Sequence, residues 1–286
     1  MTPRRSCLEI EKPLTPPSSV VVMVCVLTGV SACSSGAPET GYTLIDDMEG
    51  TSGIIEWTAL VGSPGSWDSF SDQPGSVLPL PRDEGGVWSQ DLVPAPYQTR
   101  PGITSTHAAR LRTTTPLVNQ WGAAMGFDFA DLPTLPTSST STGHSTMSAV
   151  GVDLTAFRGI SLWAMASGTG TTTVDLEVDD SNTHPSGGRC DPTATDNPRT
   201  ACYDSFSFPL DLTGTFTRYT IDFSQLKQAA FGHQTMPSVL TQDNVYGMSF
   251  AVRPPGGFCP PTTMCAGALP TLTFDIWIDD LYFVPR

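Results

Sequence analysis

Two-residue alternation of apolar and polar side chains recurs along the chain, whereas long helical periodicity is absent. The alternation is clearest at 158–166, 174–180, 248–253 and 274–279. Because successive side chains of a strand point to opposite faces, each of these segments is predicted to be a strand with one buried face. Glycine and proline, 26 residues of each, are spread throughout the chain and favour turns. We therefore expect an all-β domain, a jelly-roll β-sandwich.

The alternation assigns three apolar residues of each segment to the core. These are Ile160, Leu162 and Ala164; Val174, Leu176 and Val178; Met248, Phe250 and Val252; and Phe274, Ile276 and Ile278.

The opposite side of the same strands is expected to carry Trp163, Asp175, Glu177, Arg253 and Trp277. Large aromatic residues outside a core usually make contacts. An aromatic plane packs against the C–H face of a pyranose ring, and carboxylates and guanidinium groups hydrogen-bond its hydroxyls. These five residues are therefore candidate sugar ligands on one open face. Alternatively, long loops cover both tryptophans and form a second small core.

The first 32 residues have the features of an export signal. Arg4 and Arg5 precede an apolar run at 20–30, which is shorter than the roughly 20 residues that a membrane-spanning helix needs. The following motif, VSAC, ends at Cys33 and resembles the lipobox of bacterial lipoproteins, in which this cysteine is lipidated. An ordinary secretory signal, with Cys33 incidental, is the alternative.

The signal divides the chain into three parts. We expect 1–32 to be a lipoprotein signal peptide, 33–40 a flexible tether and 41–286 a single β-sandwich domain. The lipid would anchor the exported domain to a bacterial membrane or to the cell surface.

The net charge indicates which classes of partner the chain can bind. The signal contains three basic and two acidic residues, so the remaining chain has 11 basic and 26 acidic residues. Such a surface repels nucleic acid and anionic lipid headgroups. It suits neutral ligands and divalent cations, and it predicts that the membrane is contacted through the lipid anchor only.

Four cysteines remain beyond Cys33, namely Cys190, Cys202, Cys259 and Cys265. In an exported domain they imply two disulfides, for which three connectivities are possible. The local pairing, Cys190 with Cys202 and Cys259 with Cys265, would close two long loops. A zinc site is the alternative, although the spacings are not those of zinc motifs.

Acidic residues gather near both ends of the domain. Asp46, Asp47 and Glu49 lie on an early strand, and Asp279 and Asp280 lie on the last one, where a change in alternation predicts a β-bulge. If the two strands pair, up to five carboxylates come together, and they cannot all ionise there without a cation. Ca²⁺, which prefers oxygen ligands, would resolve the conflict. Asp275 is expected on the open face with Trp277.

Several stretches resemble a known family. LIDDMEG, WGAAMGFDF, VDLTAFRGISLWAMA, CYDSFSFPLDLTGTFTRYTIDFSQL and FDIWIDDLYF are similar to segments of galactose-binding-like β-sandwiches, and more narrowly of family 11 carbohydrate-binding modules. The resemblance spans about 41–286. It implies binding of β-glucans in a concave cleft and a structural Ca²⁺ beside paired terminal strands. On this sequence it indicates Asp47, Glu49, Asp279 and Asp280 for the metal, and Trp163, Asp175, Glu177, Arg253 and Trp277 for the cleft.

The chain is expected not to be an enzyme. A glycoside hydrolase needs two carboxylates about 5–9.5 Å apart, which Glu177 with Asp175 or Asp179 could supply. However, alternating acids also occur on any solvated strand face, and no G-x-S-x-G, H-E-x-x-H, P-loop or Rossmann motif is present. A hydrolase on the same fold and a surface adhesin or structural lipoprotein are the alternatives.

Overall fold

A computed structural model of the 286-residue chain describes residues 41–50, 53–57, 63–71, 76–79, 91–100, 103–118, 121–131, 149–194, 199–254 and 271–286. Within these ranges the chain has strands and two 3₁₀-helices, Pro185–Gly187 and Phe223–Gln225, and no α-helix. No helix of the described residues has the length and hydrophobicity to span a bilayer. The signal peptide, the tether and Cys33 lie outside the described residues.

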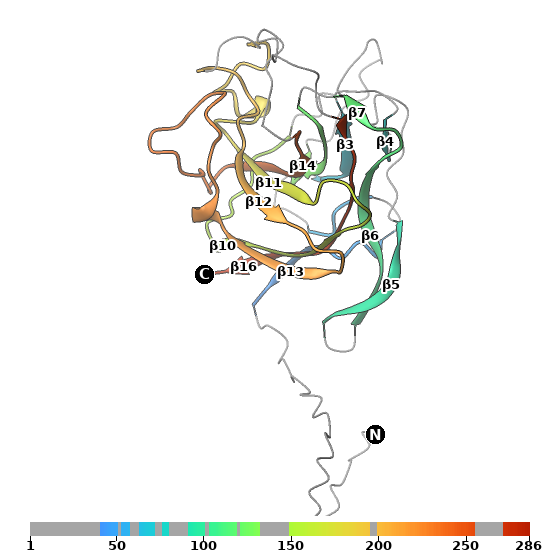
Figure 1. Ribbon diagram of the computed structural model, residues 1–286. Coiled ribbons are helices and arrows are strands. Elements are labelled where there is room, and N and C mark those ends of the chain that lie inside the picture. The colour runs from blue at the N-terminus through green and yellow to red at the C-terminus, as the bar shows by residue number, and fades with distance from the viewer. Residues whose placement is uncertain are drawn as a thin grey trace, which may run out of the picture. The chain divides into compact units, whose positions relative to one another are not determined.

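The strands form two main antiparallel sheets (Figure 1). One sheet has seven strands, in the order β13 (Thr217–Asp222), β10 (Phe157–Ala166), β16 (Asp275–Pro285), β6 (Ile103–Thr113) and β4 (Val77–Leu78), with β1 (Thr43–Asp46) paired to β16 and β5 (Asp91–Arg100) paired to β6. The other has five strands, in the order β12 (Phe206–Asp211), β11 (Thr173–Asp180), β14 (Val245–Val252), β8 (Ala123–Asp128) and β3 (Trp67–Ser71).

Two small ribbons complete the described strands. They pair β15 (Thr271–Leu272) with β7 (Leu117–Val118), and β2 (Ser63–Pro64) with β9 (Ala130–Asp131). The expected all-β sandwich is confirmed.

The main core lies between the two sheets. All twelve residues that the alternation assigned to it belong to one hydrophobic cluster, and each is at most 3% exposed. Burying one side chain of this size contributes about 1.5–3 kcal/mol, so this shared core is what holds the sheets together.

The first and last described strands pair as predicted. Thr43 is opposite Phe283, and Leu44 is opposite Tyr282. Where β10 pairs with β16, β16 advances by three residues from Asp279 to Tyr282 while β10 advances by only two. β16 therefore has one extra residue here, and Asp280 has a φ of 45°. The predicted bulge at Asp279 and Asp280 is therefore confirmed.

β5 and β6 form a hairpin (Figure 1), and β6 also pairs with β16 in the seven-stranded sheet. The pairing is irregular between Leu92 and Tyr97, where β5 contains Pro94 and Pro96. Proline cannot donate a backbone hydrogen bond, which suits a strand at the edge of a sheet.

A disulfide joins Cys190 to Cys202 in the connection between β11 and β12. This confirms one of the two local pairings that the cysteine spacing allowed. The other two cysteines, Cys259 and Cys265, lie outside the described residues.

Candidate functional site

The five residues expected on one face lie on two faces that point away from each other. Trp163 and Trp277 belong to β10 and β16 of the seven-stranded sheet, whereas Asp175 and Glu177 belong to β11 of the five-stranded sheet, and Arg253 follows β14. All four strands turn their apolar side chains into the same core. The expectation of a single face is corrected here, because alternation indicates which side of a strand is buried but not which sheet the strand joins.

On the outer face of the five-stranded sheet, one arginine bridges two carboxylates. Arg253 Nε lies 3.2 Å from Asp175 Oδ2, and Arg253 Nη2 contacts Glu177 Oε1. Ser249, opposite Glu177 in the sheet, donates its hydroxyl to Glu177 Oε2 at 3.0 Å. Burial raises the pKa values of Asp175 and Glu177, and the Arg253 guanidinium opposes that rise. The three predicted residues of this sheet thus form one connected polar group.

A second polar group lies at the next outward position of β11. Asp179 Oδ1 accepts hydrogen bonds from the hydroxyls of Thr183 at 2.8 Å and Ser205 at 2.7 Å, and burial raises the pKa of Asp179. His184 Nε2 lies 3.5 Å from Asp128 Oδ1. Burial lowers the pKa of His184, but Asp128 and Asp179 outweigh that effect and raise the pKa overall.

Tyr203 is an aromatic residue of this region that the sequence analysis missed. It is 52% exposed, and its φ of 71° is uncommon for a residue other than glycine. Burial and the charges of Asp179 and Asp128 raise the pKa of Tyr203. Its backbone N–H donates to Thr183 O at 2.9 Å, and the preceding residue, Cys202, is held by the disulfide. The adjacent cysteine was the available signal, because a cross-link can hold a strained backbone at a functional position.

Small residues occupy the outward positions between these polar groups. Gly126 pairs with Ser249, and Gly247 pairs with Asp128. A Cβ added to Gly126 would lie 2.5 Å from Met248 O, and one added to Gly247 would lie 2.8 Å from Asp128 Oδ1. β8 and β14 therefore carry only small outward side chains in the middle of this face, and the longer side chains are on β11 and at the strand ends.

The outer face of the seven-stranded sheet is covered in part by the β5–β6 hairpin. Trp277 is 3% exposed and packs with Val93, Ala108 and Met165 in a cluster separate from the main core. The Arg110 guanidinium carbon lies 4.2 Å from the centre of the Trp277 ring. For Trp277 the structure therefore has the second small core that was the alternative to an open face.

The neighbours of Trp277 on this face are also engaged. Trp163 is partly buried, with its ring centre 5.8 Å from that of Tyr97, and Tyr97 stacks on Phe216 with 4.1 Å between centres. Asp275, expected on an open face, accepts hydrogen bonds from Arg110 Nε at 2.8 Å and Arg110 Nη2 at 2.7 Å.

Asp279, one of the predicted metal ligands, takes part in a hydrogen-bond network beneath the hairpin. Its Oδ2 accepts hydrogen bonds from Tyr97 Oη at 2.6 Å and from Ser105 Oγ, and its Oδ1 accepts one from the Asp280 N–H at 2.7 Å. Burial raises the pKa of Asp279 to about 8, although these donors oppose the rise. Asp280 Oδ1 accepts a hydrogen bond from Tyr282 Oη at 2.9 Å.

Two of the N-terminal acids, Glu49 and Asp46, are held by hydrogen bonds from different parts of the chain. Glu49 Oε2 accepts a hydrogen bond from the Thr106 hydroxyl at 2.6 Å, and Oε1 accepts backbone hydrogen bonds from Thr106 at 2.7 Å and His107 at 2.9 Å. Partial burial alone would raise the pKa of Glu49, but these bonds, that of the Thr106 hydroxyl above all, lower it to about 2. Asp46 Oδ2 accepts a hydrogen bond from Trp67 Nε1 at 2.7 Å, and burial raises the pKa of Asp46 to about 6.

One set of acids has a geometry suited to a metal. Ligand atoms of Asp46, Asp47 and Glu56 lie within 4.8 Å of one another. The first and last strands do pair, but this group of described residues contains no acid of the last strand, and Asp47 is the one predicted ligand in it.

No family model matches the sequence, and no curated protein matches it either. The family 11 carbohydrate-binding module of a cellulosomal cellulase of Clostridium thermocellum has 12% identity and a TM-score of 0.44, over 86% of this chain and 95% of that module.

Two further solved structures match most of the chain at lower TM-scores. The family 30 module of another C. thermocellum cellulase has 10% identity and a TM-score of 0.35, over 77% of this chain and 98% of the module. A putative sugar binding protein from Bacteroides thetaiotaomicron has 11% identity and a TM-score of 0.33, over 85% of this chain and 95% of that one. Likeness at this level says nothing about what this chain binds.

Proposed function

We propose that residues 41–286 form a non-catalytic carbohydrate-binding domain, which binds a neutral polysaccharide on the outer face of the five-stranded sheet. The observation that carries the proposal is the polar group of Asp175, Glu177 and Arg253 on a sheet face with small residues at Gly126 and Gly247, together with the exposed Tyr203 in the connection that follows β11. The tyrosine ring offers a surface for a pyranose C–H face, and the charged groups offer acceptors and donors for hydroxyls.

Charge supports a neutral ligand. This face carries four acidic residues, Asp128, Asp175, Glu177 and Asp179, which would repel an acidic polysaccharide. The net negative charge of the whole chain would repel nucleic acid in the same way. We infer that Asp175, Glu177 and Arg253 keep the ligand-binding role expected of them. Trp163 and Trp277, on the other sheet, are then outside this site.

The test of this site is the pair Tyr203→Ala and Tyr203→Phe. Removal of the ring should weaken binding about tenfold, because an aromatic contact contributes about 0.5–1.5 kcal/mol beyond its buried area and 1.4 kcal/mol is a factor of ten. Tyr203→Phe keeps the ring and should keep most of the affinity. Affinity electrophoresis on β-glucan, xylan and galactan would measure both. Unchanged binding in Tyr203→Ala, with binding lost in Trp163→Ala, would assign the ligand to the other sheet.

A hydrolase is separated from a binding module by Glu177→Gln. In a binding module the change should weaken affinity, because a charged acceptor makes the stronger hydrogen bond. In a hydrolase it would abolish release of reducing sugar while leaving affinity nearly intact. No release of reducing ends by the unaltered protein, at any pH from 4 to 9, is the expected result. A protein partner, as for an adhesin, would show as absence of binding to every polysaccharide.

The proposal places the domain outside the cell. An apolar segment followed by VSAC supports lipidation at Cys33 and a lipid anchor in a bacterial membrane or at the cell surface. The disulfide between Cys190 and Cys202 is consistent with an oxidising compartment.

Ca²⁺ is the remaining part of the proposal. The residues that fit a hard cation are Asp46, Asp47 and Glu56, because burial and the charge of Asp47 raise the pKa of Asp46 and a cation would relieve both effects. Glu49 and Asp279, which the sequence analysis included, are not members of this group among the described residues. We therefore place the structural Ca²⁺ beside β1.

A further inference from the structure

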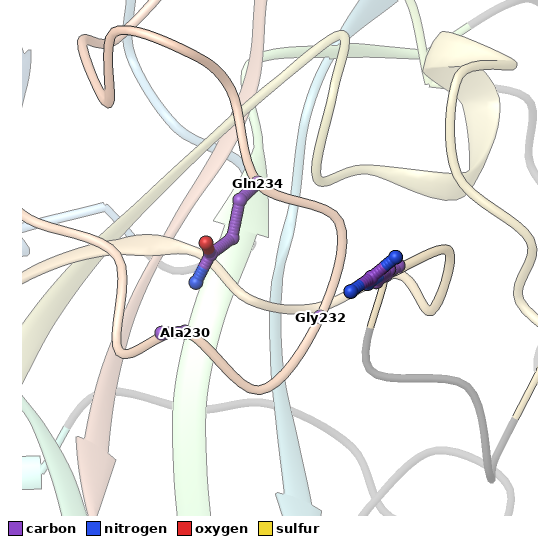
Figure 2. A pocket seen from close by; sticks show the side chains of 4 residues that line it. Ala230, Gly232 and Gln234 are labelled. Atoms are coloured by element: carbon purple, nitrogen blue, oxygen red, sulfur yellow. The ribbon is translucent and has the colours of Figure 1, made fainter.

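Asp204 has a fully buried carboxylate that binds the backbone of a distant loop. It accepts hydrogen bonds from the N–H groups of Ala229 at 3.0 Å, Ala230 at 3.2 Å and Gly232 at 3.2 Å. These donors lie between β13 and β14, on the bend that Figure 2 shows with Ala230, Gly232 and Gln234 around a pocket. Neighbouring backbone N–H groups on a bend form a concavity that binds an anion, and here the chain fills it with its own carboxylate.

The same loop binds the chain on both sides of Tyr203. The His233 N–H donates to Ala201 O at 2.8 Å, and Gln228 Nε2 donates to Asp204 O at 3.1 Å. Together with the carboxylate of Asp204, these bonds attach the segment 201–204 to one loop at several points. The backbone before and after Tyr203 is therefore fixed.

Tyr203 itself has a conformation that needs such support. Its φ of 71° is uncommon for a residue with a Cβ, and such a conformation persists only where the surrounding structure holds it. The Tyr203 N–H donates to Thr183 O at 2.9 Å, and the disulfide to Cys190 holds the preceding residue, Cys202. The disulfide is on one side of Tyr203 in the chain, and Asp204 is on the other.

We propose that Asp204 is a positioning residue for Tyr203, whose carboxylate ties the segment 201–204 to the loop at 228–233 and so keeps the Tyr203 ring exposed for the polysaccharide. The proposal rests on the function proposed above. A ring that is fixed before binding loses little conformational freedom when the ligand binds. Asp204 is fully buried, so it affects affinity only through Tyr203.

The test is a double-mutant cycle between Asp204→Asn and Tyr203→Ala in the full chain. Affinity electrophoresis would use whichever of β-glucan, xylan and galactan the unaltered protein binds. Asn places an NH₂ group among the backbone donors and should release the loop. Alone, Asp204→Asn should weaken binding about threefold to tenfold, because it can remove no more than the roughly tenfold contribution of the Tyr203 ring. In Tyr203→Ala the same change should have no further effect.

Gly232→Ala tests the same contact without a change of charge. A Cβ added to Gly232 would lie 2.7 Å from both Ala201 O and Asp204 Cβ, so it should push the loop away from the segment 201–204. It should weaken binding in the unaltered background and have no effect in Tyr203→Ala. The matched control is Gly214→Ala, whose added Cβ has no atom within 4 Å and which should bind like the unaltered protein.

Fluorine NMR of the protein with fluorotyrosine in place of tyrosine observes the ring directly. The resonance that is missing from Tyr203→Phe belongs to Tyr203. It should shift or broaden in Asp204→Asn and stay unchanged in Gly214→Ala. A purely structural role of Asp204 would lower the melting temperature without this change in the spectrum.

The possible results separate this proposal from the proposed function. Additive losses of affinity in the double mutant, unchanged binding in both Asp204→Asn and Gly232→Ala, or an unchanged Tyr203 resonance overturns the positioning role while the site at Tyr203 stands. Unchanged binding in Tyr203→Ala, or no binding to any of the three polysaccharides, overturns the proposed site and the positioning role with it.

Discussion

Replacement of Trp277 by alanine tests which face of the sandwich is structural. The ring is 3% exposed and fills the space between β16 and the β5–β6 hairpin. Its removal should leave a cavity and detach part of the hairpin, without any effect on a ligand bound to the other sheet.

The magnitude follows from the contacts of Trp277. Truncation of a buried Trp to Ala costs about 3–5 kcal/mol of unfolding free energy. The contact with the Arg110 guanidinium, at 4.2 Å, adds about 0.5–1 kcal/mol at a partly exposed position. Nε1 of Trp277 has no hydrogen-bond partner among the described residues, so no hydrogen bond is lost there. For the total of about 3.5–6 kcal/mol, the melting temperature of a domain of this size should fall by about 7–24 °C.

Calorimetry and affinity electrophoresis on the same preparation separate stability from binding. The expected result is a lower melting temperature with unchanged polysaccharide affinity below that temperature. Trp277→Phe, which keeps an aromatic ring, should show a smaller loss. A Trp277→Ala protein that melts like the unaltered protein but loses affinity would mean that the hairpin opens and that the ligand occupies the seven-stranded sheet.

Three further predictions concern other parts of the chain. Asp279 has a pKa of about 8 in the folded protein and about 4 in the unfolded chain, so the folded state binds one more proton between these values and its stability should fall as pH rises from about 4 to 8. In urea denaturation, Asp279→Asn should flatten this dependence on pH. An equally steep dependence in the variant would contradict the prediction. Ca²⁺ at a hundredfold excess over its Kd should stabilise the domain by about 2.7 kcal/mol and raise its melting temperature. Asp47→Asn should remove this increase, whereas Asp279→Asn should keep it. A melting temperature of the unaltered protein that does not change on chelation would exclude the metal. Cells labelled with a fatty-acid analogue should label this protein, and label that persists in Cys33→Ser would exclude lipidation at Cys33.

Alternation along each strand determined a large part of this fold. Phe250 and Ile276 were placed in the core from the sequence alone, because a period of two allows only one face to be buried. The bulge at Asp279 and Asp280 could be predicted for the same reason, since an inserted residue changes the phase of the alternation. The disulfide between Cys190 and Cys202 agreed with their short separation.

Tertiary structure alone decided how the polar residues are grouped. Trp277 and Glu177 have the same out-of-core register, yet the first lies under a hairpin and the second faces away on the opposite sheet. Local alternation is set by neighbours in the chain, whereas the sheet that a strand joins and the segment that covers it depend on partners far along the chain. Tyr203 is a related case: the adjacent cysteine was a signal for it in the sequence, but its exposure depends on the path of the loop that the disulfide between Cys190 and Cys202 closes, and that path is decided by the tertiary structure.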